Sequence, residues 1–299
     1  MKRRQFIHNS LALIGSSLLS LPAKASGNVV PEVRWLGGAT LEISFDGLRI
    51  LTDPCLGEGE EAFVMADPNE MFDLEKGPNI KTHKRLTPFP GLNHDAYDVV
   101  LLSHAHEDHF DQKAQSWIPR DIPVLCSEFD EVDLQAKGLR AQKLGHGQTR
   151  VFPTLSGRVT VTSVPAHHSL SPQVSGILGT GNGYWIEFDI GGLKRSLYWA
   201  GDTFDTPQVL AAIAPFGHPD MFIPHIGAVG TSGSLGQISM SGKQALDFAD
   251  KINTQNVLPI HHSTYALYLE GVEPIAREFQ NREYSFALNI LPEGEKIDV

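Results

Sequence analysis

The chain has 299 residues, enough for one large domain with its own hydrophobic core. With 41% hydrophobic and 20% charged residues, its composition excludes a disordered, collagen-like or coiled-coil protein. The 24 Lys and Arg against 35 Asp and Glu give a net charge of −11, so we expect no nucleic-acid partner. Cys55 and Cys126 can form at most one disulfide bond, and the sequence does not decide whether they do.

The first 25 residues predict an export signal. Arg3 and Arg4 precede an apolar run over 11–21, and Ala23-Lys24-Ala25 has the pattern of a cleavage site. The run is shorter than the roughly 20 apolar residues that span a bilayer. The arginine pair followed by Phe6 resembles a twin-arginine signal, so we expect cleavage after Ala25, the twin-arginine export machinery as a partner and a periplasmic protein. The alternative is an ordinary secretory signal.

Beyond this segment, apolar patterning predicts strands early and late in the chain with helices between them. A hairpin is expected from strands at 41–45 and 48–52 around Asp46-Gly47, after a first strand at 33–36. Further strands are expected at 99–102, 123–125, 159–164, 184–190, 196–200, 221–223 and 257–258, and helices at 127–138, 208–214, 242–252 and 274–279. No linker interrupts residues 31–299, so we expect one domain of the α/β (α+β) class, with helices on the outer faces of its sheets.

Residues 53–96 form a long segment without a sustained period. It contains five prolines and is too long for a passive connection. We expect a lid or a substrate-binding loop. Its apolar side chains are candidates to line a pocket, namely Phe63, Val64, Met65, Met71, Phe72 and Phe89.

Histidines are concentrated at 104–109, 167–168 and 261–262, each time directly after a strand-like run. The first of these segments reads His104-Ala105-His106-Glu107-Asp108-His109. Because alternate residues leaving a strand point the same way, His104 and His106 can bind one metal ion, and Asp108 and His109 are offset toward a second. Neutral imidazoles with carboxylates suit zinc or a similar transition metal. Asp53 is expected to brace a loop beneath the metals.

The sequence also contains Trp35-Leu36-Gly37, Leu51-Thr52-Asp53-Pro54, Lys84-Arg85, Pro165-Ala166-His167-His168, Ala200-Gly201-Asp202-Thr203 and Pro259-Ile260-His261. Together with the 103–111 segment, these motifs resemble the metallo-β-lactamase superfamily, and within it the branch of the N-acyl-phosphatidylethanolamine-hydrolysing phospholipase D and the ascorbate-6-phosphate lactonase-like proteins. The resemblance covers roughly residues 31–299. It implies a four-layer αββα sandwich with a metal centre between the two sheets.

The resemblance also implies a ligand set. One metal would be held by His104, His106 and His168, the other by Asp108, His109 and His261, and Asp202 would bridge them. The branch pattern selects His168 over His167 and His261 over His262. His167, His262 and His225 are then candidates to orient ligands or to contact the substrate. Three residues depart from the branch: Gly38, where a His is common, Glu107, where the phospholipase has an aromatic residue, and His225, which interrupts Pro224-Ile226-Gly227-Ala228.

The function implied is that of a binuclear hydrolase with two divalent ions, zinc being the first choice. A hydroxide shared by the ions would attack a phosphodiester or ester-like bond, with Asp108 and Asp202 as the catalytic residues. Lys84 and Arg85 beside an apolar loop favour a small-molecule or lipid substrate with a phosphate, so an N-acyl phospholipid ranks above a lactone. The alternatives are a lactonase, a mononuclear iron enzyme that oxidises sulfur compounds, and a non-catalytic binding protein. The complete second ligand set disfavours the last two.

Overall fold

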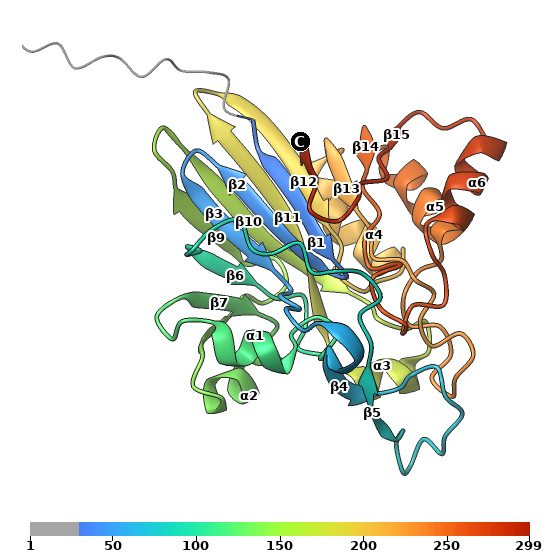
Figure 1. Cartoon of the computed structure of the whole chain (residues 1–299). Helices are drawn as coiled ribbons and strands as arrows, with labels where there is room; N and C mark the ends of the chain where they lie inside the picture. Colours follow the sequence, from blue (N-terminus) through green and yellow to red (C-terminus); the bar gives the residue numbers. More distant parts are fainter. Residues whose placement is uncertain (1–29) are drawn as a thin grey trace, which may run out of the picture.

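The computed structural model describes residues 30–299 (Figure 1). The expected export signal lies outside this range, and its processing stays a prediction. Within the described residues, no helix is long and apolar enough to cross a membrane. Cys55 and Cys126 are both buried and free.

Two seven-stranded sheets form the centre of the fold (Figure 1). The first has the strand order β16-β1-β2-β3-β6-β7-β8 and the second β15-β14-β13-β12-β11-β10-β9. The strands of the first sheet are β1 Glu32–Gly37, β2 Thr40–Phe45, β3 Leu48–Thr52, β6 Val99–Leu101, β7 Pro123–Cys126, β8 Arg140–Lys143 and β16 Lys296–Asp298. Those of the second are β9 Thr149–Pro153, β10 Gly157–Ala166, β11 Gly181–Ile190, β12 Leu193–Trp199, β13 Met221–Ile223, β14 Asn256–Val257 and β15 Ala287–Leu288.

Helices cover the outer face of each sheet. They are α1 Gln112–Trp117, α2 Glu131–Ala136, α4 Pro207–Ile213, α5 Gly242–Ile252 and α6 Glu273–Asn281. A further helix, α3 Pro172–Leu178, packs against the 53–96 segment instead. One hydrophobic core lies between the sheets and includes Trp35 and Trp199, a second joins the first sheet to α1 and α2, and a third joins the second sheet to α4, α5 and α6. The αββα sandwich expected from the sequence is therefore confirmed.

Strand direction brings the functional loops to one edge. Strands β3, β6 and β7 are parallel, and so are β12, β13 and β14. Strand β10 runs with β12, because both are antiparallel to β11. The carboxyl ends of parallel strands meet at the same edge of a sheet. The loops after β10, β12, β13 and β14 therefore lie at one edge of the second sheet, and the loop after β6 lies against them. Four of these five loops carry the predicted metal ligands.

One predicted helix begins later than expected. The sequence predicted a helix over 127–138, but α2 begins at Glu131. Residues 127–130 form a turn instead, in which the Ser127 hydroxyl donates to the Asp130 carboxylate at 2.7 Å and the Asp130 amide donates back to the Ser127 hydroxyl at 3.2 Å. Side chains that bond their own backbone in this way compete with helix formation.

Candidate metal centre

Six histidines and two aspartates converge between the sheets. His104, His106, Asp108 and His109 follow β6, His168 follows β10, Asp202 follows β12, His225 follows β13 and His261 lies beyond β14. All are buried except His106, which is half-buried. The structure thus brings together all seven residues predicted as metal ligands, along with His225.

Hydrogen bonds fix which ring nitrogen of His109, His168 and His261 faces the centre. The Nδ1 atom of His168 donates to the Ile238 carbonyl at 2.7 Å, and that of His261 to the Ile226 carbonyl at 2.8 Å. The Nδ1 atom of His109 lies 2.7 Å from the Asp53 carboxylate, so Asp53 braces a ligand, as expected. The opposite nitrogen, Nε2, is left with its lone pair directed inward.

Three histidine nitrogens of the cluster have no hydrogen-bond partner. Among the described residues, the Nε2 atoms of His104, His109 and His261 are buried without a hydrogen bond. A buried polar atom without a partner costs about 1–3 kcal/mol. Such atoms at a cluster of histidines and carboxylates fit a bound metal ion, which would accept their lone pairs.

The ligand atoms fall into two groups with Asp202 between them. His104, His106 and His168 present nitrogens within 4.8 Å of one another. The Asp202 Oδ2 atom is 3.6 Å from His168 Nε2, whereas its Oδ1 atom is 3.4 Å from His109 Nε2 and 3.8 Å from His261 Nε2. One oxygen of the Asp202 carboxylate therefore faces each group, which is the placement of a bridging ligand.

Asp108 belongs to the second group. Its Oδ2 atom is 3.4 Å from His261 Nε2 and 3.8 Å from His109 Nε2. His225 also lies there, but both of its nitrogens are occupied. The indole N–H of Trp199 donates to His225 Nε2 at 2.8 Å, so the proton sits on Nδ1, which donates to Asp202 Oδ1 at 2.9 Å. His225 thus orients the Asp202 carboxylate and is not a residue of the pocket wall.

The electrostatics of the centre favour a cation. Burial alone would raise the pKa of the Asp202 carboxyl, but His261 and His109 hold it well below its usual range, and the same two histidines lower the pKa of Asp108. Burial keeps the pKa of His104 well below its ordinary value and lowers that of His106 to about 4. Burial alone would lower the pKa of His109, but the Asp202 and Asp108 carboxylates raise it well above its ordinary value, so a metal ion bound there would displace a proton from His109.

A cavity of about 460 Å³ opens onto the centre. Its floor includes His106, Asp108, His168 and Asp202. Its walls are mostly apolar and come from Val64, Met65, Ala66, Pro68, Phe72, Leu74, Pro78 and Ile80 of the 53–96 segment, Ile177 and Leu178 of α3, and Val229, Leu235 and Ile238. The predicted lid therefore does line a pocket, and within it β4 (Phe63–Ala66) and β5 (Ile80–His83) form a hairpin next to α3 (Figure 1).

Several sequence-based expectations about this pocket are wrong. Phe63 packs on His83 and Tyr265, Phe89 packs on Arg85, and Met71 is 79% exposed, so these three do not line it. Nor do the two basic residues expected to bind a phosphate. Lys84 pairs with Glu60 at the surface, and Arg85 is buried in a salt bridge to Glu293 at 2.6 Å.

His167 and His262, the neighbours of two predicted ligands, lie outside both the ligand groups and the pocket wall. The His167 ring bonds the Thr206 hydroxyl at 2.7 Å. The His262 ring packs on Trp35 with the ring centres 4.8 Å apart. Neither position supports the predicted contact with substrate. The pocket residues of α3 were missed, although Ser171, which accepts from the Val174 amide, followed by Pro172 is a helix-start signal.

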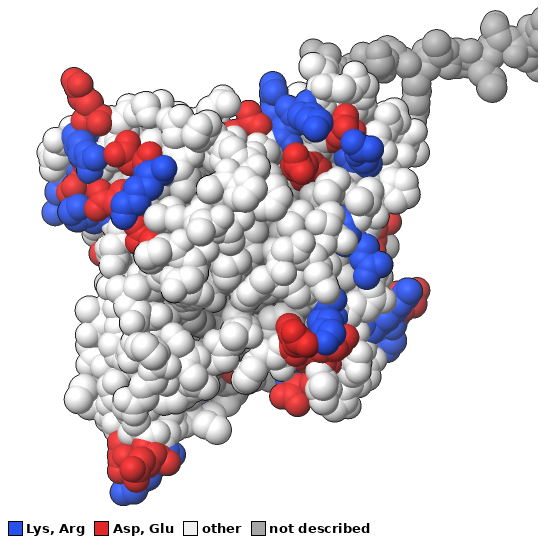
Figure 2. Space-filling view, turned by 180° about the vertical axis from the view of Figure 1, so that it is seen from behind, with Lys and Arg blue, Asp and Glu red and all other residues white. Residues whose placement is uncertain are grey.

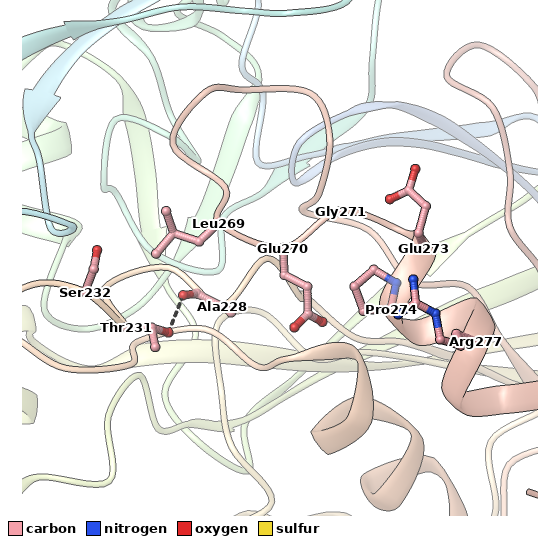
Figure 3. Close-up of a pocket in the computed structure, with 9 residues that line it drawn as sticks. All are labelled: Ala228, Thr231, Ser232, Leu269, Glu270, Gly271, Glu273, Pro274 and Arg277. Carbon is pink, nitrogen blue, oxygen red and sulfur yellow. Dashed lines mark hydrogen bonds between the residues drawn. The ribbon is translucent and has the colours of Figure 1, made fainter. Parts of the chain in front are cut away.

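A second hollow lies beyond the loop that contains Val229 and Leu235. Figure 3 shows its lining, which includes Thr231, Leu269, Glu270, Glu273 and Arg277. The Glu270 carboxylate already accepts the Gly242 amide at 2.5 Å. None of the described residues that line this hollow is a histidine or belongs to the metal centre.

The chain belongs to the metallo-β-lactamase superfamily: the β-lactamase superfamily domain matches residues 48–262. A UPF0173 metal-dependent hydrolase of Methanoregula boonei is 30% identical over 210 residues, which are 68% of this chain and 82% of that protein. The N-acyl-phosphatidylethanolamine-hydrolyzing phospholipase D 1 of Caenorhabditis elegans is 25% identical over 270 residues, 83% of this chain and 70% of that protein.

Solved structures share the fold. The isothiocyanate hydrolase from Delia radicum gut bacteria superposes with a TM-score of 0.70 at 21% identity, covering 89% of this chain and 98% of that one. A possible metal-dependent hydrolase from Veillonella parvula superposes with a TM-score of 0.71 at 17% identity, covering 91% of this chain and 100% of that one. Within its superfamily, the protein is a metal-dependent hydrolase.

Proposed function

We propose that the protein is a binuclear hydrolase that cleaves an ester-like bond next to an apolar group. The observation that carries this proposal is the Asp202 carboxylate, which has one oxygen toward each of two ligand groups. His104, His106 and His168 would hold one divalent ion, and Asp108, His109 and His261 the other. Nitrogen and carboxylate ligands favour zinc.

Two such ions, when bound, supply Lewis acidity that lowers the pKa of water and stabilises negative charge on the oxygen under attack. The chain supplies the arrangement of the groups around them. Asp108 and Asp202 both face the cavity, so the Asp108 carboxylate can accept a hydrogen bond from a water molecule beside the scissile bond and orient it. His225 holds Asp202 in place, and Asp53 fixes the His109 ring.

The pocket favours a carboxylic ester or lactone with an apolar acyl part. Its walls are apolar, and no Lys or Arg is among the described residues that line it. A phosphate would therefore have only the metal ions to balance its charge. This differs from the ranking expected from sequence, because that ranking depended on Lys84 and Arg85, which lie outside the pocket.

A second candidate is a phosphodiesterase acting on N-acyl phospholipids. The similarity to the Caenorhabditis elegans phospholipase D favours it, and the apolar cavity would accept part of an acyl chain.

We further propose that the protein works in the periplasm after export by the twin-arginine machinery, which the first 25 residues support.

The test is hydrolysis by zinc-loaded protein of a hexanoyl ester, a lactone and an activated phosphodiester of matched chain length. We expect the ester or lactone to have a kcat/KM at least tenfold above that of the phosphodiester. The reverse order would support the phospholipase candidate. Failure to cleave any of the three in the presence of two bound metals would contradict the proposed hydrolysis of ester-like bonds.

A further inference from the structure

Glu107 places a carboxylate at the wall of an otherwise apolar pocket. It lies between the predicted ligands His106 and Asp108 and lines the same cavity. Its carbonyl oxygen accepts the Cys55 thiol at 3.6 Å, which holds the backbone of this residue in place. The Glu107 side chain therefore projects from a fixed point beside the metal centre.

This carboxylate has no partner in any other described residue, and its own backbone amide donates to it. Among residues 30–299, no other residue forms a salt bridge or a side-chain hydrogen bond with it. Lys137 and Asp108 act on its charge only through space and with opposite signs. Because no basic side chain lines the cavity, this carboxylate is free to pair with a bound group of opposite charge.

The rest of the lining indicates what kind of group this would be. The other acids at the cavity, Asp108 and Asp202, face the metal ligands, and no basic residue is available there to pair with Glu107. A quaternary ammonium group suits this environment, because it carries a positive charge but has no N–H groups that need hydrogen-bond acceptors. Its methyl groups can contact apolar walls such as those of Leu178 and Ile80.

We propose that Glu107 is a specificity-determining residue that selects substrates whose apolar body carries a cationic group. The proposal deepens the proposed hydrolase function and depends on it. The Glu107 carboxylate favours a cation in the pocket and disfavours a second negative charge there, and discrimination of this kind is a difference between two affinities. The apolar walls of the cavity thus select the apolar body of the substrate, and Glu107 selects the charge of the group attached to it.

The experiment compares two esters of the same shape that differ in charge, hexanoylcholine and 3,3-dimethylbutyl hexanoate. At pH 8 and low salt, we expect zinc-loaded wild-type protein to favour the choline ester by about tenfold in kcat/KM. Glu107→Gln should bring this ratio close to one. The matched control is Glu75→Gln, an exposed acid of the 53–96 segment that does not line the cavity, and it should keep the wild-type ratio.

A binding measurement separates this inference from the hydrolase proposal. Isothermal titration calorimetry with hexyltrimethylammonium should show binding to wild type that is about tenfold weaker in Glu107→Gln. If neither ester is cleaved but this difference holds, ester hydrolysis is contradicted and the role of Glu107 stands. Equal binding to the two proteins, or a wild-type ester ratio near one, would overturn the role of Glu107.

Discussion

His225 shows how a residue outside the ligand set controls the centre. It receives a hydrogen bond from Trp199 and gives one to Asp202, so its ring links the core between the two sheets to the Asp202 carboxylate. Sequence patterns identify residues that bind a metal because their spacing is distinctive. His225 stands alone in the sequence, so no spacing marks it. Its role depends on partners in β12 and in the loop after β12, which only the folded structure brings next to it.

Replacing His225 by Ala should weaken metal binding by about 10–100-fold, because the Asp202 carboxylate loses the group that orients it. The measurement is metal affinity by competition with a chelator. The matched control is His262→Ala, which removes another buried histidine next to the centre but one that packs on Trp35. Equal loss of metal affinity in both variants would contradict the assigned role of His225.

Among the elements, those with strong local signals agree best with the sequence. Helix α5 spans Gly242–Ile252 as expected, because Ser241 and Gln244 form a capping box at its start and Asn253 ends it in the left-handed region. The helices α1 and α3 have six and seven residues and were missed, although α4, also of seven residues, was predicted. Their start signals, Asp111 for α1 and Ser171-Pro172 for α3, were overlooked.

The predicted phosphate site at Lys84 and Arg85 is wrong because the direction of a side chain depends on tertiary contacts. A pair of basic residues beside a lid predicts a phosphate site only if both side chains face the lid. Here β5 ends at His83, and Arg85 turns inward to Glu293, the Leu36 carbonyl and the Tyr265 hydroxyl. These partners are distant in the sequence, so the direction of Arg85 is set by tertiary contacts that no local pattern encodes.

The lid is fastened to the body of the protein by Asn69. Its side chain accepts the Gly230 amide at 2.7 Å and donates to the Leu267 carbonyl at 2.8 Å. Asn69→Ala removes both bonds and should raise KM for the ester about tenfold with little change in metal content, because the pocket wall loosens while the ligands stay in place. Hydrogen exchange at 64–80 should also speed up. An unchanged KM together with unchanged exchange would contradict this role.

The Asp130 carboxyl before α2 should make stability depend on pH. Burial raises its pKa to about 6, while the hydrogen bond from Ser127 opposes the shift. Between about pH 4 and 6 the folded state then binds more protons at this group than the unfolded state, so the contribution of Asp130 to stability falls as pH rises.

Asp130→Asn removes this titration. The variant should be more stable than wild type by about 1–3 kcal/mol at pH 7, and this gain should shrink toward pH 4. Urea unfolding at several pH values measures the difference. A gain that is independent of pH would argue against titration of Asp130 as the cause.

At the scale of the whole molecule, the charges are spread in small mixed groups. On the face shown in Figure 2, acidic and basic residues lie next to one another, and the described residues of that face form no continuous basic stripe. The net charge of the chain is −11, so the acidic residues outnumber the basic ones even though the two kinds are mixed on this face.

Export should require both arginines of the signal. A twin-arginine signal is recognised by a receptor, so changing Arg3 and Arg4 to Lys together keeps the charge but should block export. Fractionation of cells that express the variant and the wild type measures this. Normal recovery of the variant from the periplasm would instead support the ordinary secretory route.

The central claim is that two ligand groups share Asp202, and the metal content of purified protein tests it most directly. Elemental analysis of protein prepared without chelator should give about two divalent ions per chain. The Asp202→Asn variant should lose metal from both sites, because the proposed bridging carboxylate binds both ions. A reproducible single iron per chain with no second metal, unchanged by Asp202→Asn, would contradict the binuclear account.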